Sequence, residues 1–153
     1  MPTGWRIVKT RLAKRPFDGE GARLYGGRWN SVGVRMVYTA GSVSLAVLEM
    51  LVHLESSDVL PSYSLCAVHF DEAVMAHLDR RRLSDKWRES PAPPELLMIG
   101  DAWIAARSSA VLEVPSAVVE SESNYLINPE HPDFASLVID PPMPFTFDPR
   151  LLG

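Results

Sequence analysis

The sequence predicts a single α+β domain in which short helices pack on a mixed central sheet. A chain of 153 residues, 46% of them hydrophobic, can form one core that buries roughly two-thirds of its unfolded surface. A strand, a turn and a helix follow one another over residues 34–54, and short apolar segments separated by turns follow later in the chain. We therefore expect one domain over residues 1–153, organised around the segment at 34–54.

The predicted helix of this segment begins after Ser42, because serine oxygens cap the first turn of a helix. Apolar residues then occur all round the helix as far as Leu54, a pattern typical of a buried helix. Glu49 is the one carboxylate among them, and an unpaired buried charge is costly. Glu49 therefore either lies at the edge of the apolar surface, near solvent or an arginine, or faces a cleft that takes a positively charged substrate.

The residues before this helix favour a cleft. The alternation over residues 34–38 predicts a strand that ends at Tyr38 on its inward face, one tight turn before the helix. Further upstream, a Gly-Gly-Arg sequence ends at Arg28. Glycines without side chains let the backbone and the guanidinium approach a ligand closely. Arg28, Tyr38 and Glu49 are thus candidates for one site.

Other elements are expected along the rest of the chain. The predicted strands cover residues 5–8, 63–70, 110–114 and 136–140, the predicted helices cover 73–78 and 102–107, and a glycine-rich loop covers 16–27. The segment at 63–70 suits an interior strand, which we expect to pair beside residues 34–38. Asp101 is expected to cap the helix at 102–107. Phe145 and Phe147 are expected to dock the tail.

Two further polar residues lie in predicted strands. Pro115 interrupts an extended segment, which places Ser116 at a strand edge or bulge. From there the Ser116 hydroxyl either points into a site or satisfies nearby backbone groups. Arg6, in the first strand, is either a second basic contact for a ligand or a solvated arginine at the edge of the sheet.

Composition and charge exclude several classes of function. The formal net charge of -4 and the isoelectric point near 5.5 argue against direct nucleic-acid binding, and the basic residues at 80–88 alternate with acids as on a solvated face. The single cysteine, Cys66, fits a reducing compartment. No apolar run resembles a signal peptide or a membrane span. We expect a cytoplasmic protein with no membrane contact.

Familiar ligand-binding motifs are missing from the sequence. It contains no GxGxxG, GxxxxGK[ST], HExxH or CxxC motif, so any dinucleotide site is not of the Rossmann type. Residues 128–133 include Asn, Glu, His and Asp, but two prolines and the lack of a second ligand cluster argue against a metal site. We expect no metal.

Four motifs in order resemble the RES domain family, the toxin component of bacterial RES/Xre toxin–antitoxin pairs. They are GARLYGGRWNS, VYTAGSVSLAVLEMLVHL, LEVPSAVVESESNYLINPEHPDF and PFTFDPRLL. The resemblance extends over nearly the whole chain. It implies a fold like that of the ADP-ribosyltransferase toxins, with NAD consumed as the substrate.

The resemblance also implies roles for particular residues. The arginine, glutamate and serine that give the family its name correspond to Arg28, Glu49 and Ser116, although the nearby Ser123 leaves the serine assignment open. Glu49 would stabilise positive charge on the ribose, Arg28 would bind the pyrophosphate, and Tyr38 and Ser116 would contact the nicotinamide ribose. Further candidate contacts are Tyr25, Asn30 and Asn124.

The implied function is a toxin that cleaves the nicotinamide–ribose bond of NAD, as a glycohydrolase or a phosphorylase. The alternatives are a protein ADP-ribosyltransferase toxin and a non-catalytic binding module in which Glu49 forms a structural ion pair with Arg28. The implied partner is an Xre-type helix-turn-helix antitoxin that covers the cleft, and a homodimer within the toxin–antitoxin complex is a further expectation.

Overall fold

The computed structural model describes residues 1–54 and 61–152, and the polar break expected at 55–58 lies outside them. The strands are β1 (Thr3–Lys9), β2 (Val37–Ala40), β3 (Tyr63–His69), β4 (Met75–His77), β5 (Val111–Pro115), β6 (Ser123–Ile127), β7 (Val138–Ile139) and β8 (Met143–Phe145). The α-helices are α1 (Glu20–Tyr25), α2 (Val43–Leu51) and α3 (Pro94–Ala106). Short 3-10 helices cover Thr10–Leu12, Glu72–Val74, Arg80–Arg82, Pro132–Ser136 and Pro149–Leu152.

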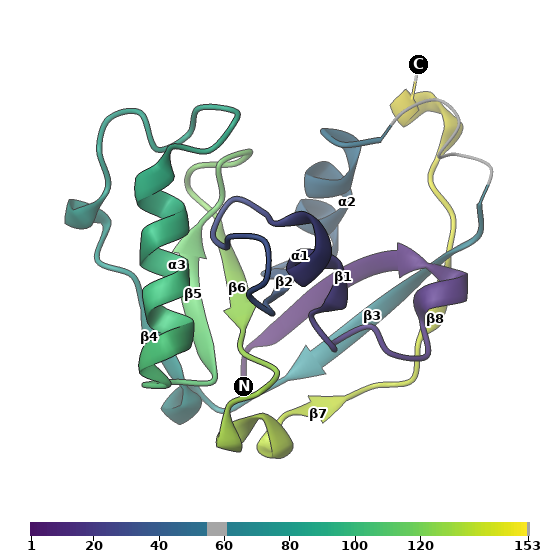
Figure 1. Cartoon of the computed structure of the whole chain (residues 1–153). Coiled ribbons are helices and arrows are strands. Elements are labelled where there is room, and N and C mark those ends of the chain that lie inside the picture. Colours follow the sequence, from purple (N-terminus) through teal and green to yellow (C-terminus); the bar gives the residue numbers. More distant parts are fainter. Residues whose placement is uncertain (55–60, 153) are drawn as a thin grey trace.

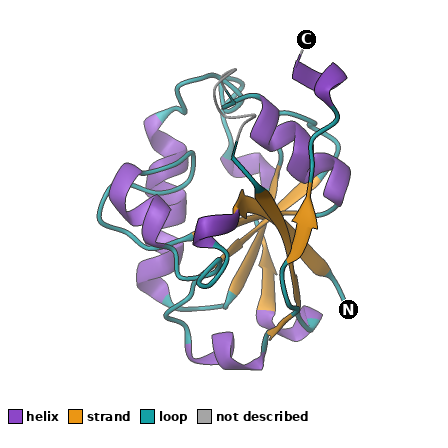
Figure 2. Cartoon of the chain, turned by 90° about the vertical axis from the view of Figure 1, so that its right-hand side faces the viewer, coloured by secondary structure: helices purple, strands orange, loops and turns teal. Residues whose placement is uncertain are grey.

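The strands form one mixed sheet in the order β4-β5-β6-β2-β1-β3-β7, with β8 also beside β3 (Figure 1). The pair β4 and β5 is parallel, whereas β1, β2, β3 and β6 join their neighbours in antiparallel pairs. The helices lie around the periphery of the strands (Figure 2). The prediction of a mixed central sheet with short helices is therefore confirmed.

Alternation of side chains along the strands divides the core between two faces of the sheet. On one face, Leu45 of α2 packs on Leu65 and neighbouring residues, and Trp103 of α3 packs with Leu126. On the other face, loops cover a third cluster, whose buried residues are Val8, Phe17, Val37, Cys66, Val68, Phe70, Ala110, Val111, Ile127 and Leu137. The face with α2 and α3 is the one that carries Tyr38 and Asn124.

Strand β1 lies between β2 and β3, so the predicted pairing of residues 63–70 beside 34–38 is wrong. Trp5 is opposite Ala40 of β2 on one side and Ala67 of β3 on the other. The strand expected at 34–38 is also displaced, because β2 begins only at Val37. The preceding backbone has another partner, since the Asn30 side chain donates to the Val34 carbonyl at 3.1 Å.

Helix α2 begins where the sequence predicts, with the Ser42 oxygen accepting a hydrogen bond from the Leu45 amide at 3.1 Å. The prediction that it is buried all round is wrong. Leu45 and Ala46 are buried, but Leu48 is 40% exposed and Val52, just past the helix, is 57% exposed. The helix packs on β1 and β2. The apolar composition therefore marks an exposed surface as well as a core contact.

Helix α3 is longer than the helix predicted at 102–107, because it begins at Pro94. Proline at the first position of a helix needs no amide hydrogen bond there. Asp101 is thus in the middle of the helix and is not its cap. Gly100 faces the loop that carries Trp29, and a Cβ at Gly100 would lie 1.6 Å from the Trp29 carbonyl oxygen. This glycine lets the helix approach the loop closely.

Three other predicted elements are wrong. Residues 73–78 form a 3-10 turn and then β4, because the Asp71 carboxylate accepts from the Ala73 amide at 2.8 Å and the chain then pairs with β5. The loop expected over 16–27 contains α1. The core strand expected at 136–140 is the two-residue β7, whose side chains are exposed because it pairs at the rim of the sheet.

The first strand, the strand at 63–70 and the strand at 110–114 are confirmed as β1, β3 and β5. The docking of the tail is also confirmed. Phe147 is buried, with its ring centroid 5.1 Å from that of Tyr63 and 5.0 Å from that of Phe145 in edge-to-face contacts. No helix in the described ranges is long and apolar enough to cross a membrane.

Candidate active site

Glu49 is fixed by two side chains from distant parts of the chain. Its Oε1 accepts hydrogen bonds from Ser116 Oγ at 2.7 Å and from Asn124 Nδ2 at 2.8 Å. Helix α2 supplies the carboxylate, the end of β5 supplies the serine and β6 supplies the asparagine. Oε2 accepts no hydrogen bond from the residues that the structure describes. The carboxylate is therefore oriented through one oxygen and leaves the other free.

Ser116 is fully buried, and its oxygen has a complete set of partners. It accepts from the amides of Val118 at 3.1 Å and Val119 at 3.0 Å. Since a hydroxyl has two acceptor sites and one donor, the remaining proton points to Glu49. Ser116 thus joins the turn after β5 to the carboxylate. Ser123 does not reach it by any described contact, and its carbonyl accepts from the Gly41 amide at 3.0 Å, before α2.

Asn124 presents an unused acceptor at the same place. Its Nδ2 donates to Glu49, whereas its Oδ1 is buried and has no partner among the described residues. This orientation of the amide is the one that gives the carboxylate a donor. A buried carbonyl oxygen without a donor is costly, so a ligand hydroxyl or amide that donates to Oδ1 would be favoured.

Arg28 is half-buried and is fixed at one nitrogen. Its Nη1 donates to the carbonyl of Trp87 at 3.1 Å and to that of Glu89 at 2.9 Å. Burial lowers the pKa of the Arg28 guanidinium, while the Glu49 carboxylate has the opposite effect on it. Nε and Nη2 donate to no described residue. The guanidinium is therefore anchored and still has donors for an anion.

Arg28 and Glu49 make no ion pair of 4 Å or less in the described part of the chain. Their charges are close enough to influence each other, as the opposing effect of Glu49 on the pKa of Arg28 indicates. The structural ion pair required by the binding-module alternative is thus not observed between these residues. Both side chains keep polar atoms available for a ligand.

Tyr38 and Asn30 support the loop that carries Arg28. The Tyr38 hydroxyl donates to Asn30 Oδ1 at 2.6 Å and accepts from the Trp29 amide at 3.0 Å. Burial raises the pKa of the Tyr38 phenol far above its ordinary value. A Cβ at Gly27 would lie 2.6 Å from the Tyr38 hydroxyl. Gly27, directly before Arg28, therefore makes room for this tyrosine.

Asn30 is buried, and its amide is saturated by protein groups. Nδ2 donates to the carbonyls of Ala22, Ser31 and Val34 at 2.9 to 3.1 Å. Its place in the structure is that of a support for the loop. Tyr25, in contrast, is 84% exposed at the end of α1. The structure thus brings Glu49, Ser116 and Asn124 into contact, and it brings Arg28 near them.

Arg6 is not a solvated arginine at the sheet edge, because β1 is an interior strand. Its Nη1 donates to the Tyr38 carbonyl at 3.1 Å, and its Nε is buried with no partner in the described ranges. Burial lowers the pKa of the Arg6 guanidinium. Arg6 therefore contributes a half-buried positive charge from β1, beside the strand that carries Tyr38.

The contacts that position Arg28 were not predicted from the sequence. The Asp101 carboxylate accepts two hydrogen bonds from Ser31, one from its backbone amide at 2.9 Å and one from its hydroxyl at 2.6 Å. This fixes the loop after Arg28 to α3. The carbonyls of Trp87 and Glu89 are backbone groups, so no side-chain motif signals them. Among the residues that the structure describes, no group of three or more His, Cys, Asp or Glu side chains could hold a metal ion.

The structure is a single α+β domain in which a carboxylate is oriented by Ser116 and Asn124, and an arginine anchored through one nitrogen lies near it. A family model described as "RES domain" matches residues 3–148. The chain belongs to the RES domain family.

Individual relatives agree with this assignment. The chain is 40% identical over 148 residues to "Toxin Res" of Yersinia enterocolitica, covering 96% of this chain and 97% of the relative. It is 35% identical over 153 residues to the "Prs ADP-ribosylating toxin" of a Sphingobium species, covering 97% and 95%. The fold is similar to a chain in the crystal structure of the M. tuberculosis MbcT–MbcA toxin–antitoxin complex, with a TM-score of 0.77, 19% identity and coverage of 95% and 84%.

Proposed function

We propose that this chain is the toxin of a toxin–antitoxin pair and that it consumes NAD by cleaving the bond between nicotinamide and ribose. The observation that carries the proposal is the orientation of Glu49: Ser116 and Asn124 fix its Oε1, and no residue that the structure describes donates to its Oε2. Such a carboxylate is preorganised to stabilise a positive charge that develops in the transition state. The names of the relatives support a toxin.

The chemistry of NAD fits this site. The nicotinamide of NAD is a cationic pyridinium, so it leaves as a neutral molecule and needs no general acid. The barrier lies in the positive charge that develops on the ribose, as in glycoside hydrolysis. The free oxygen of Glu49 would face this charge, and the unused Oδ1 of Asn124 could accept a hydrogen bond from a ribose hydroxyl or the carboxamide.

The pyrophosphate of NAD would bind at Arg28. A guanidinium matches phosphate oxygens with two parallel hydrogen bonds, and Nε and Nη2 of Arg28 have no acceptor in the described part of the protein. Nη1 would meanwhile stay on the carbonyls of Trp87 and Glu89. In this proposal Tyr38 and Asn30 position the arginine, and Ser116 positions the glutamate.

Two classes of acceptor for the ADP-ribosyl group are considered. Water or inorganic phosphate would make the chain a glycohydrolase or a phosphorylase, which depletes NAD. A protein acceptor would make it an ADP-ribosyltransferase, and the name of the Sphingobium relative supports this second candidate. We favour depletion, since it needs no further target in the cell.

The partner we propose is an antitoxin that shields Arg28 and Glu49 until it is degraded. The structural neighbour is part of a toxin–antitoxin complex, which supports a partner of this kind. An Xre-type antitoxin with a helix-turn-helix would supply operator binding. A homodimer of the toxin within that complex stays a prediction.

The test is to incubate the purified chain with NAD and to identify the products. Release of nicotinamide with ADP-ribose indicates hydrolysis, and release with a phosphorylated ADP-ribose indicates phosphorolysis. Label transferred from NAD to protein indicates the transferase. Glu49→Gln and Arg28→Ala proteins with native circular dichroism serve as controls. If the wild-type protein releases no nicotinamide with any acceptor, the proposal is wrong.

A further inference from the structure

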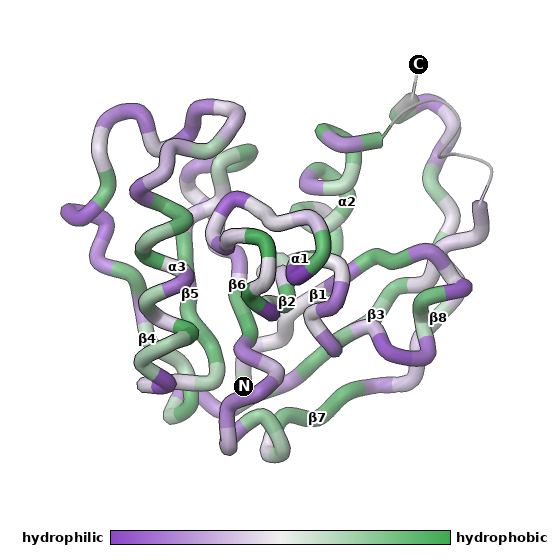
Figure 3. The backbone as a smooth tube through the Cα atoms, in the orientation of Figure 1, coloured by the Kyte–Doolittle hydropathy of each residue, from purple (hydrophilic) through white to green (hydrophobic). Residues whose placement is uncertain are grey.

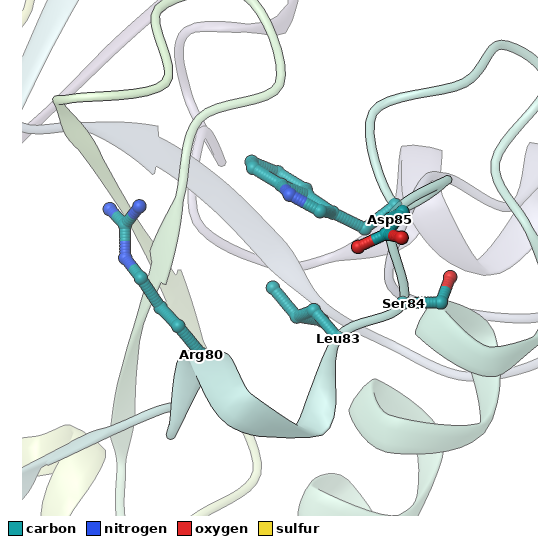
Figure 4. Close-up of a pocket in the computed structure, with 5 residues that line it drawn as sticks. Arg80, Leu83, Ser84 and Asp85 are labelled. Atoms are coloured by element: carbon teal, nitrogen blue, oxygen red, sulfur yellow. The ribbon is translucent and has the colours of Figure 1, made fainter.

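The segment that joins β4 to α3, residues 78–93, contains a pocket of about 240 Å³. The residues that line it are Arg80, Leu83, Ser84, Asp85 and Trp87. Figure 4 shows Arg80 on one side, Asp85 on the other and Leu83 between them. The volume is somewhat below the usual range for drug-sized ligands, and it has room for one flat heterocycle. The segment is largely hydrophilic (Figure 3).

This pocket is joined to the candidate active site through Arg28. The same residue that contributes an indole to the pocket, Trp87, accepts a hydrogen bond at its carbonyl from Arg28 Nη1 at 3.1 Å. Arg28 and the pocket therefore share one residue, Trp87, through its carbonyl and its side chain respectively. A ligand that extends from Glu49 past Arg28 would continue towards this segment.

The side chains around the pocket suit a purine base. Trp87 and Leu83 offer apolar surface, and an indole stacks on flat heterocycles. The Asp85 carboxylate forms no hydrogen bond or ion pair with other described residues, so it can accept from an exocyclic amine. An adenine has flat faces and one such amine. The pocket thus offers both kinds of contact that an adenine requires.

The walls of the pocket are fixed before any ligand binds. Both terminal nitrogens of Arg80 donate hydrogen bonds to the backbone carbonyl of Glu120, each at 3.2 Å. Ser84 Oγ donates to Glu95 Oε1 of α3 at 2.5 Å. The pocket is therefore held between α3 and the loop that follows Ser116. A preformed site avoids part of the entropic cost of binding.

We propose that this pocket binds the adenine ring of NAD, with Trp87 as the stacking residue. This inference rests on the proposed function, since it assigns the second half of the same substrate. Arg28 then lies between the two halves of the dinucleotide, beside its pyrophosphate. The toxin would accordingly prefer NAD to nicotinamide mononucleotide, which has the same scissile bond and no adenine.

Binding is tested first with AMP, which carries the adenine and a phosphate and cannot be cleaved. The full chain with Glu49→Gln is titrated by calorimetry, alone and with Trp87→Ala, Trp87→Phe or Arg81→Ala. Arg81 is in the same segment, is exposed and pairs with Asp79, so its loss is a matched control. Trp87→Ala is expected to weaken AMP binding about 5- to 150-fold, the usual effect of losing one stacked base. Trp87→Phe and Arg81→Ala should retain it.

The second measurement compares substrates on the chain with Glu49 intact. Trp87→Ala should raise KM for NAD by a similar factor and should lower kcat/KM for nicotinamide mononucleotide by a clearly smaller factor. Equal losses for both substrates, or AMP binding that does not respond to Trp87→Ala, would overturn the inference. Because Trp87 packs against the cluster below α3, Trp87→Phe tests the stacking with less change in packing.

The two proposals fail in different ways. AMP binding that depends on Trp87, in a chain that cleaves no NAD, would overturn the proposed function and support the pocket. NAD cleavage with unchanged KM in Trp87→Ala would support the function and overturn the pocket.

Discussion

Ser116 and Glu49 are 67 positions apart in the chain, and their side chains meet in a hydrogen bond of 2.7 Å. The serine oxygen also accepts from the amides of Val118 and Val119, so its proton has one direction left. This contact fixes the half-buried carboxylate of a short helix against the turn that follows β5. The predictions that follow depend on it or on the contacts that hold Arg28.

Glu49→Gln should lower the rate of NAD cleavage at least about 100-fold, the usual loss when one preorganised electrostatic group is removed. Glutamine keeps the size of the side chain and lacks the negative charge. The measurement is nicotinamide release by purified protein under saturating NAD. Glu130→Gln is the control, because the Glu130 side chain is 61% exposed and its ion pair is a 3.9 Å contact with Arg35, away from Glu49. Cleavage by Glu49→Gln at the wild-type rate would remove Glu49 from the mechanism.

Ser116→Ala should lower the free energy of unfolding by about 1–3 kcal/mol, because it removes the buried hydroxyl that bonds to Glu49 and to the amides of the half-buried Val118 and Val119. It should also lower kcat, since Glu49 loses a donor that orients it. Denaturant unfolding and NAD cleavage measure the two effects. Ser123→Ala should change the free energy of unfolding by less than about 0.5 kcal/mol. A larger effect at Ser123 than at Ser116 would contradict this assignment.

Arg28→Lys should raise KM for NAD about 10- to 100-fold, with a smaller change in kcat. A lysine has one charged nitrogen, so it cannot both contact the carbonyls of Trp87 and Glu89 and form a paired contact with phosphate. Steady-state kinetics give KM and kcat separately. Arg81→Lys tests whether any arginine matters, since Arg81 is 90% exposed and contacts Asp79. An unchanged KM in Arg28→Lys would show that the paired hydrogen bonds of the guanidinium are not used to bind NAD.

Gly100→Ala should destabilise the protein by about 3 kcal/mol or more, the upper range for overpacking, because the new Cβ would lie 1.6 Å from the backbone oxygen of Trp29. The comparison is Gly21→Ala in α1, where a Cβ meets nothing within 4 Å. That change should stabilise slightly, since alanine favours helix more than glycine. Thermal unfolding followed by circular dichroism measures both. A Gly100→Ala protein that melts at the wild-type temperature would mean that α3 can move away from the loop that carries Trp29.

Glu20 should titrate far below an ordinary glutamate. Hydrogen bonding to Arg23, with help from Arg35, lowers its pKa from 4.5 to about 2. Because the folded protein holds this proton less tightly than the unfolded chain, the contribution to stability is present above pH 4.5 and is lost as the pH falls towards 2. Carbon-detected NMR titration of the carboxyl measures the value. Glu20→Gln should make stability less dependent on pH in that window, and a pKa near 4.5 in the folded protein would contradict the prediction.

Part of the site was predictable because its signals are local. Ser42 caps α2 as its residue type indicates, and Gly27 precedes Arg28 where only a glycine leaves room for Tyr38. Each of these depends on residues within a few positions or on one side chain. The sequence therefore predicted Glu49 on a capped helix and Arg28 in the glycine-containing segment upstream of it.

The exposure of α2 and the position of β1 were not predictable in the same way. An apolar helix is expected to be buried, yet Leu48 and Val52 are exposed. One of the two alternatives for Arg6 placed it at the sheet edge, and this one is wrong because β2 and β3 pair with β1 from both sides. Both properties depend on which segments become neighbours, and periodicity along one segment carries no information on that.

The sequence by itself determined the α+β class, the capped helix that carries Glu49, the glycines before Arg28 and the membership in the RES domain family that its motifs indicated. Only the tertiary structure decided that Ser116 contacts Glu49, that Asn124 keeps a free oxygen there, and that backbone carbonyls near Trp87 anchor Arg28. The physical reason is that hydrogen bonds between distant segments depend on distances in space, and those are set when the sheet brings its strands together.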